Sequence, residues 1–227
     1  MTIFRAVLMD FDGVIGNTAQ DFLNAWRAAF KPINLQFHDQ DCLVLEGQRG
    51  IEIAAQLLTR GGHDPGRAAE FKRAKDDYYA KHNSFSFYPG VPELLTLLRQ
   101  KGIKCALVSG GSGPKTLQPP HDQLLRLFDV VLSGQDVREA KPAPDLFLSA
   151  AAKLKLTPQE CLVIENAPLG IEAANRAGMQ CIGVTSTLDS KLLIGANLVI
   201  PSIEKLHELL IFANSATPSG LSVRGLE

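Results

Sequence analysis

Six short apolar runs, separated mostly by segments of helix length, constrain the fold of this 227-residue sequence more than any other feature. The runs are Phe4 to Met9, Ile103 to Val108, Val130 to Leu132, Cys161 to Ile164, Cys181 to Val184 and Leu198 to Ile200. Strands buried on both faces of a parallel sheet read as continuous apolar runs, and parallel neighbours need long crossover connections. The pattern therefore predicts an α/β fold with a mainly parallel sheet flanked by helices.

One interval of the chain breaks this alternation. From about Thr18 to Phe87 the sequence has helical periodicity and no convincing strand. The helical segments that we expect there are Thr18 to Phe30, a weak one around Gln40 to Glu46, Ile51 to Arg60 and Arg67 to His82. We therefore predict a core of residues 1–17 and 88–213 and an all-helical insert of residues 18–87. Residues 214–227 lose apolar periodicity and are predicted to be a flexible tail.

Charge and cysteine usage exclude several classes of protein. The 23 basic and 24 acidic residues leave a formal net charge of −1, so no global field attracts nucleic acid or a membrane surface. No apolar run approaches the roughly 20 residues of a membrane-spanning helix. The four cysteines have no CxxC spacing and the five histidines never pair at short spacing, which disfavours zinc and suits reduced thiols. We expect a cytoplasmic protein, a monomer or weak dimer, without nucleic-acid or membrane partners.

Polar residues directly follow several of the apolar runs. They are Asp10 and Asp12 after the first run, Ser109, Gly110 and Gly111 after the second, Glu165 and Asn166 after a later one, and Lys141 in a nearby loop. In open parallel sheets, ligands bind beyond the carboxyl ends of the strands, which share one edge. The sequence therefore predicts that these residues form one site.

Each of these residues also has a structural explanation. An Asp-x-Asp before a glycine suits a turn, Ser109 with its glycines suits another turn, and Glu165 suits a helix cap. Lysine is most often a solvated surface charge. Two carboxylates after a buried strand, however, repel each other unless a cation or separate protonation states accommodate them. The sequence lacks the P-loop pattern GxxxxGK[ST] and the dinucleotide pattern GxGxxG, which disfavours nucleotide-fuelled transfer.

Four segments, in this order, resemble the motifs of the haloacid dehalogenase superfamily. They are MDFDGVI, VSGGS, EAKPAPDLF and VIENAPLGIEAANRAGM. The resemblance covers nearly the whole chain and is to the branch with a helical cap inserted after the first strand, which includes beta-phosphoglucomutase and phosphoglycolate phosphatase. It implies a Rossmann-like core with an all-helical cap.

The resemblance also implies a role for each residue of the predicted site. Asp10 would be the nucleophile, and Asp12 would protonate the leaving oxygen and later activate water. Ser109, Gly110, Gly111 and Lys141 would bind the transferring phosphoryl group. The cofactor Mg²⁺ would be held by the Asp10 carboxylate, the Asp12 backbone carbonyl, Glu165 and Asn166.

Two residues depart from the family pattern. Asn166 stands where many relatives have an aspartate, and it can offer magnesium an oxygen but no charge. Phe22 falls about where beta-phosphoglucomutase has a histidine, which weakens a mutase assignment. In the cap, the segment Leu45 to Arg49 resembles the one that meets the distal part of the substrate in related enzymes, and Arg49 is the best candidate for specificity.

The sequence therefore predicts an enzyme, a Mg²⁺-dependent phosphatase of small phosphorylated metabolites such as a sugar phosphate or phosphoglycolate. It would act through an aspartyl-phosphate intermediate. A sugar phosphomutase of the beta-phosphoglucomutase type is the alternative enzyme, distinguished by a bisphosphate requirement. A catalytically silent binding or regulatory protein is the alternative of another class, with Asn166 as its only hint.

Overall fold

A six-stranded parallel sheet forms the centre of the molecule, in a computed structural model that describes residues 2–111, 121–213 and 219–226. The strands are β1 (Ala6–Met9), β2 (Lys104–Ser109), β3 (Val130–Ser133), β4 (Cys161–Glu165), β5 (Gln180–Val184) and β6 (Leu198–Ile200). They lie in the order β3-β2-β1-β4-β5-β6, and every neighbouring pair is parallel. All six predicted strands are confirmed, with β1 in the middle of the sheet.

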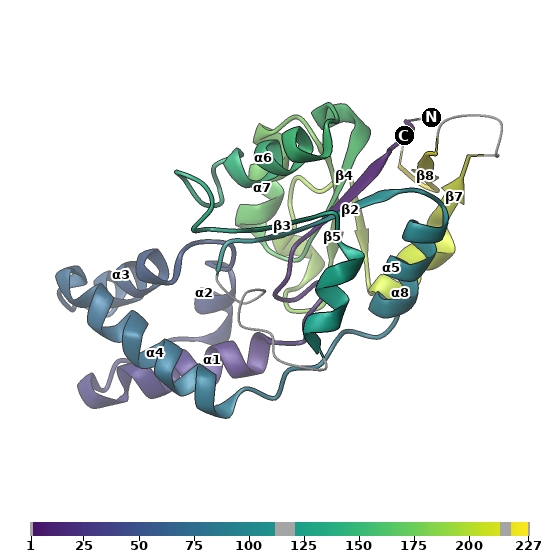
Figure 1. Ribbon diagram of the computed structural model, residues 1–227. Coiled ribbons are helices and arrows are strands. Elements are labelled where there is room, and N and C mark those ends of the chain that lie inside the picture. The colour runs from purple at the N-terminus through teal and green to yellow at the C-terminus, as the bar shows by residue number, and fades with distance from the viewer. Residues whose placement is uncertain (1, 112–120, 214–218, 227) are drawn as a thin grey trace.

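Two layers of helices cover the sheet (Figure 1). The helices are α5 (Val91–Gln100), α6 (Asp145–Leu154), α7 (Pro168–Arg176) and α8 (Ile203–Leu209). In Figure 1 the pair α6 and α7 lies on one side of the sheet and the pair α5 and α8 on the other. The prediction of a Rossmann-like core with a mainly parallel sheet flanked by helices is confirmed.

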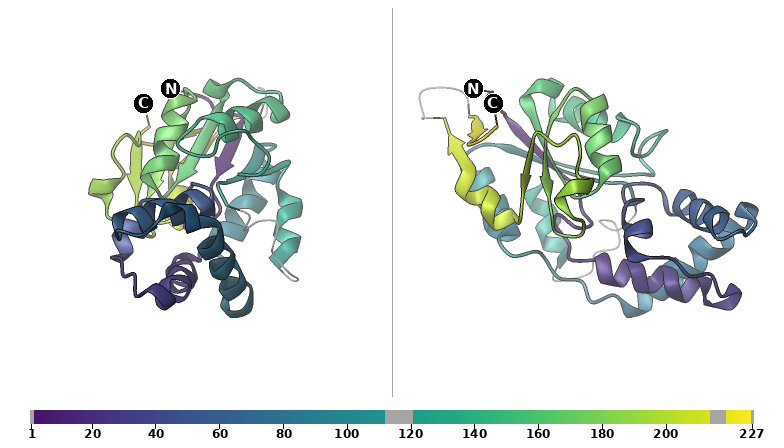
Figure 2. Two further views of the ribbon diagram at one scale, coloured as in Figure 1. Left: turned by 90° about the vertical axis from the view of Figure 1, so that its left-hand side faces the viewer. Right: turned by 180° about the vertical axis from the view of Figure 1, so that it is seen from behind.

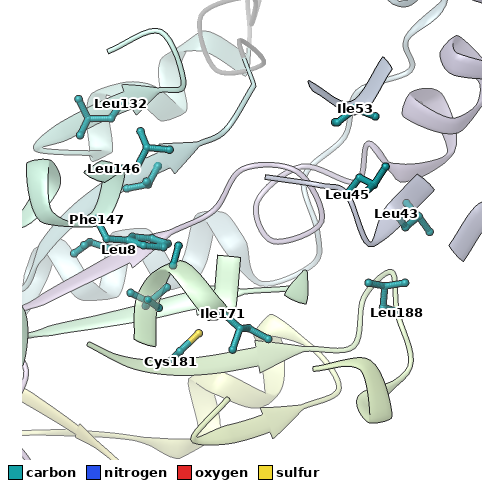
Figure 3. Close-up of a cluster of buried hydrophobic side chains, with 14 of the residues drawn as sticks. Leu8, Leu43, Leu45, Ile53, Leu132, Leu146, Phe147, Ile171, Cys181 and Leu188 are labelled. Carbon is teal, nitrogen blue, oxygen red and sulfur yellow. The ribbon is translucent and has the colours of Figure 1, made fainter. Parts of the chain in front are cut away.

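Each face of the sheet has its own hydrophobic core, because successive side chains of a strand point to opposite faces. Along β1, Ala6 and Leu8 belong to one cluster, while Val7 and Met9 belong to the other. The Leu8 cluster extends beyond the sheet to Leu43 and Leu45 of the helical insert. Figure 3 shows these two leucines beyond the core residues, with Leu188 of a core loop near them. The insert and the core therefore share one buried apolar cluster.

The segment between β1 and α5 is entirely helical in its regular structure. It contains α1 (Ala19–Phe30), α2 (Asp39–Leu43), α3 (Gly50–Arg60) and α4 (Ala68–His82). Short 3₁₀ helices are Lys31–Ile33 and Pro65–Arg67 in this segment, and His121–Leu127, Pro158–Glu160 and Ser190–Leu192 elsewhere. Helix α4 packs against both α1 and α3, and Figure 2 shows the four helices gathered beyond one end of the sheet. The all-helical insert is confirmed, whereas the division into domains at residues 17/18 and 87/88 stays a prediction.

The two chain segments that join this insert to the core lie side by side. The Asn17 amide donates to the Ser86 carbonyl at 2.8 Å, and the Tyr88 amide donates to the Ile15 carbonyl at 3.0 Å. An antiparallel bridge pairs Gly16 with Phe87 between these two bonds. The outgoing and returning segments therefore form a short two-stranded ribbon.

The predicted flexible tail is wrong for residues 219–226. Strand β8 (Leu221–Val223) pairs antiparallel with β7 (Leu210–Phe212), and neither strand was predicted. Leu221 also exchanges two backbone hydrogen bonds with Phe4, at 2.7 and 2.8 Å. Leu221 is fully buried, so its burial holds the end of the chain against the core. Residues 214–218 of the predicted tail lie outside the described residues.

The remaining expectations concern the thiols and the surroundings of the protein. All four cysteines are buried and unpaired, as expected of reduced core thiols. In the described part of the chain, no helix has both the length and the apolar character that a bilayer crossing requires. Cytoplasmic location and a monomeric or weakly dimeric state stay predictions.

Candidate active site

Three adjacent strands bring the predicted residues to one edge of the sheet. Met9 at the end of β1 is level with Leu107 of β2 and Ile164 of β4, so Asp10 emerges between Ser109 and Glu165. The Asp10 amide is still bonded to the Ile164 carbonyl, at 3.0 Å. The carboxyl-end location predicted from the sequence is therefore where these residues lie, and all three side chains are buried.

Lys141 joins all three of these strand ends. Its ammonium donates to Asp10 Oδ1, to Glu165 Oε1 at 2.6 Å and to the Val108 carbonyl at 3.1 Å. The side chain is completely buried, so Lys141 is not the solvated surface charge that lysine usually is. Burial alone would lower the pKa of Lys141, but the two carboxylates outweigh burial and raise it above its ordinary value.

Asp12 differs from Asp10 in its partners. Its Oδ1 accepts a hydrogen bond of 2.7 Å from the Thr18 hydroxyl. Burial, with a contribution from the nearby Asp10 charge, raises the pKa of Asp12 from 3.8 to about 6. A carboxyl group with such a pKa can hold a proton and release it near neutral pH, as a general acid and base must.

The loop after β2 lies directly under the helical insert. The Gly111 amide donates to Ser109 Oγ at 3.2 Å. A Cβ added to Gly110 would lie 1.8 Å from the carbonyl oxygen of Gly47, which belongs to the insert. Only glycine at 110 permits this approach. The insert is therefore closed over the strand ends in this structure.

Glu165 and Asn166 offer oxygen atoms that suit a hard cation. Glu165 Oε2 accepts a hydrogen bond of 3.1 Å from the backbone amide of Asn166. The side-chain Oδ1 of Asn166 is buried without a hydrogen-bond partner among the described residues. Buried polar atoms normally have partners, so this oxygen needs an explanation such as an ion. Hard oxygen ligands of this kind fit Mg²⁺.

A complete metal cage is not already assembled around a single point. Among the described residues, no group of three or more His, Cys, Asp or Glu side chains has an arrangement suited to hold a metal ion. The acidic groups bond to protein donors instead: Asp10 and Glu165 to Lys141, and Asp12 to Thr18. The residues thus fit magnesium in chemistry, and the assignment of ligands stays a prediction.

Arg49 lies at the boundary between the insert and the core. Its guanidinium donates to three backbone carbonyls of a core loop: Gly134 at 3.1 Å, Val137 at 2.9 Å and Arg138 at 2.6 Å. In this closed arrangement Arg49 fastens the start of α3 to the core. Its predicted contact with substrate stays a prediction, and these bonds give it a second task.

Sequence reasoning missed two residues of the site. Thr18 looks like a helix N-cap, yet its hydroxyl bonds Asp12 and makes no cap bond to α1. Glu46 is 4% exposed, and Oε2 accepts from Asn166 Nδ2 at 3.0 Å. Burial, with Asp12 and Asp10 nearby, raises the pKa of Glu46 well above its ordinary value. The sequence pointed to the segment Leu45 to Arg49, which contains Glu46, but not to its partner Asn166, which lies 120 positions away.

The similarity of the chain to known proteins agrees with this geometry. Residues 7–184 match the family described as haloacid dehalogenase-like hydrolase. The chain belongs to the haloacid dehalogenase-like hydrolase family. The resemblance inferred from the four motifs is therefore confirmed, and with it the expectation of an enzyme.

Relatives of this haloacid dehalogenase-like hydrolase include mutases and phosphatases. Beta-phosphoglucomutase of Bacillus subtilis is 31% identical over 90% of this chain and 94% of its own length. Fructose-1-phosphate phosphatase YqaB of Escherichia coli is 30% identical over 80% of this chain and 96% of its own length. The solved beta-phosphoglucomutase of Clostridium difficile has a TM-score of 0.79 and 28% identity, covering 89% of this chain and 93% of that one.

One relative is much longer than this haloacid dehalogenase-like hydrolase. Protein SUPPRESSOR OF QUENCHING 1, chloroplastic, of Arabidopsis thaliana is 34% identical over 83% of this chain but matches only 18% of its own length. The matched region therefore also occurs within a larger protein.

Proposed function

We propose that this chain is a Mg²⁺-dependent phosphatase of small phosphorylated metabolites, with sugar phosphates as the principal substrate class. The observation that supports this proposal most is that the two carboxyl groups at the end of β1 have different surroundings. Asp10 is buried against the Lys141 ammonium, while burial raises the pKa of Asp12 to about 6. Such a pair divides nucleophilic attack and proton transfer between two residues.

The first half-reaction transfers the phosphoryl group to the enzyme. An Asp10 oxygen forms a bond to phosphorus as the ester P–O bond breaks, and protonated Asp12 gives its proton to the leaving oxygen. The alcohol leaves neutral, and an aspartyl phosphate remains on Asp10. The pKa of about 6 keeps part of the Asp12 population protonated near neutral pH.

The second half-reaction returns the enzyme to its starting state. Ionised Asp12 accepts a proton from water while the water oxygen bonds to phosphorus and the bond from phosphorus to Asp10 breaks. Inorganic phosphate leaves, and both carboxyl groups recover their original forms. The Thr18 hydroxyl, 2.7 Å from Asp12 Oδ1, keeps this carboxyl group oriented in both steps.

Ser109 and Lys141 would bind the transferring group. The ammonium of Lys141 has three hydrogens, and Asp10, Val108 and Glu165 accept all of them. A phosphoryl oxygen would therefore replace one of these acceptors, while Lys141 continues to position Asp10. Backbone amides of Gly110 and Gly111 would add donors to the phosphoryl oxygens.

Magnesium would be held by the Asp10 carboxylate, the Asp12 backbone carbonyl, Glu165 and Asn166. When bound, it supplies positive charge that balances the phosphate and the acidic side chains. Oδ1 of Asn166 is buried and has no hydrogen-bond partner in the part of the chain that the structure describes, which supports this assignment.

A sugar phosphomutase is the second candidate, because beta-phosphoglucomutases are among the similar proteins. It would return the phosphoryl group to a second sugar hydroxyl instead of water. Phe22 lies about where that enzyme has a histidine. Its ring packs edge-on against Trp26, with 6.3 Å between the ring centroids. An apolar ring at this place favours the phosphatase.

The test is phosphate release from a panel of substrates, with and without Mg²⁺. The panel contains fructose 1-phosphate, hexose 1- and 6-phosphates, phosphoglycolate and nucleotides, and the variant is Asp10→Asn. We expect Mg²⁺-dependent release that falls by about 10³-fold or more in Asp10→Asn, because the nucleophile is lost.

Asp77→Asn is the matched control, since it makes the same chemical change at an exposed position on α4. Circular dichroism and thermal unfolding should show that both variants fold. Undiminished release by Asp10→Asn would refute the proposal. Conversion of hexose 1-phosphate to its isomer, only after addition of a hexose bisphosphate, would favour the mutase.

A further inference from the structure

Asn166 and Glu46 form a side-chain hydrogen bond between the core and the helical insert. The Asn166 Nδ2 group donates to Glu46 Oε2 at 3.0 Å and to the Thr187 hydroxyl at 2.9 Å. Asn166 is completely buried, and Glu46 is 4% exposed. This contact is shielded from water, so solvent does not compete for the hydrogen bond.

These two hydrogen bonds determine how the side-chain amide of Asn166 is oriented. Glu46 Oε2 and Thr187 Oγ1 take both hydrogens of the Nδ2 group, so Oδ1 is the atom left for another partner. Gly13 closes the remaining space, because a Cβ added there would lie 2.1 Å from Asn166 Nδ2. The amide is therefore fixed, with Oδ1 buried and without a hydrogen-bond partner among the described residues.

An aspartate at position 166 would not fit this arrangement. Its carboxylate would face the Glu46 carboxylate at about the present 3.0 Å, and two like charges at such a distance cannot both stay ionised in a buried site. An amide removes the repulsion and adds a donor. Asn166 and Glu46 are thus chemically matched, one in the core and one in the insert.

We propose that Glu46 is a positioning residue that the insert brings to the magnesium site when it closes. Its carboxyl group fixes Asn166 with Oδ1 available to the cation. This inference rests on the proposed function, because it assumes that the site takes a divalent cation.

Closure and metal binding are then coupled. With the insert displaced, Asn166 loses its Glu46 contact, and the orientation of Oδ1 is no longer fixed. By linkage, a cation that binds the closed form better also favours closure. This coupling can be measured without any substrate.

The experiment is a double-mutant cycle of Glu46→Gln, Asn166→Asp and the double variant. Mn²⁺ serves as the metal probe, its free concentration is measured by electron paramagnetic resonance, and metal-free radii of gyration come from small-angle X-ray scattering. Glu70→Gln is the matched control, since its carboxylate on α4 is 58% exposed and pairs only with Arg67 among the described residues.

We expect Glu46→Gln to weaken Mn²⁺ binding by about tenfold, and Glu70→Gln to leave it within about twofold. Asn166→Asp alone should enlarge the metal-free radius of gyration, because an aspartate there has no amide hydrogen to donate to Glu46. Addition of Glu46→Gln to it should restore the wild-type radius, a non-additive result that reports direct contact.

Two results would overturn the inference. One is Mn²⁺ affinity in Glu46→Gln equal to that of Glu70→Gln, and the other is a metal-free radius of Asn166→Asp equal to that of the double variant. These measurements are independent of turnover, so they distinguish failure of this inference from failure of the proposed phosphatase, which Asp10→Asn tests.

Discussion

At the scale of single residues, the site depends on a buried ammonium with three acceptors. Lys141 connects the ends of β1, β2 and β4 through Asp10, the Val108 carbonyl and Glu165. Buried carboxylates repel each other and are costly to desolvate, and one shared cation reduces both penalties. The sequence predicted that Lys141 belongs to the site from the position of its loop, but not that it would be fully buried.

Asp12 should make stability depend on pH. Its pKa is about 6 in the folded chain and 3.8 at its ordinary value, so the folded state binds the proton more tightly. The associated stabilisation is complete below about pH 4 and is lost as the pH rises through about 6. Each pKa unit corresponds to about 1.4 kcal/mol, so the loss is at most about 3 kcal/mol.

Urea unfolding of the metal-free protein in EDTA, between pH 4 and 7, measures this effect against Asp12→Asn. The wild type should lose stability relative to the variant as the pH rises, because the amide does not titrate. A constant difference over this range would show that Asp12 has an ordinary pKa.

At the scale of elements, the contact between Gly47 and Gly110 controls how the insert meets the core. A Cβ on Gly110 would meet the Gly47 carbonyl oxygen at 1.8 Å, so Gly110→Ala must move the loop or keep the insert from closing. We expect kcat/KM for phosphate release to fall by about 100-fold, since small displacements of a catalytic site have large effects.

Gly62→Ala is the control for this change. Gly62 lies in the insert, and no described atom is within 4 Å of its added Cβ, although its φ of +74° makes any side chain somewhat strained. It should alter stability slightly and leave turnover near the wild-type value. Equal kinetic effects of the two substitutions would mean that the Gly110 contact has no special role.

Most of the elements could be predicted from the sequence, because buried parallel strands and amphipathic helices have strong local patterns. The contacts between elements could not. Arg49 bonds to backbone carbonyls, which have no side-chain signature, and Glu46 bonds to a residue 120 positions away. Strand β7 follows α8 with no residue between them, and β8 lies in a stretch without apolar periodicity, so neither has a strand pattern of its own.

At the scale of the whole molecule, the two ends of the chain meet at the edge of the core. Figure 1 shows the N- and C-terminal labels side by side, and Phe4 and Leu221 form the bridge between these ends. Both side chains belong to the core cluster that packs under α5 and α8. The C-terminal strand is therefore part of the folded unit.

Leu221→Ala should lower the free energy of unfolding by about 2–4 kcal/mol, because it leaves a cavity at a fully buried position. Ile211→Ala on the neighbouring strand β7 is the control, since Ile211 is 39% exposed and should cost less than about 1 kcal/mol. Urea unfolding measures both. Equal small losses would indicate that the strand contributes nothing to stability.

The ribbon formed by Ile15 to Asn17 and Ser86 to Tyr88 limits how the insert can move. A single connecting segment would let the insert rotate about several axes. Two hydrogen-bonded segments side by side can bend like a hinge, but they resist twisting and sliding past each other. The main motion left to the insert is then a hinge rotation toward and away from the core. Each closure should return Glu46, Gly47 and Arg49 to the core along the same path, so that their contacts re-form without a search in each turnover.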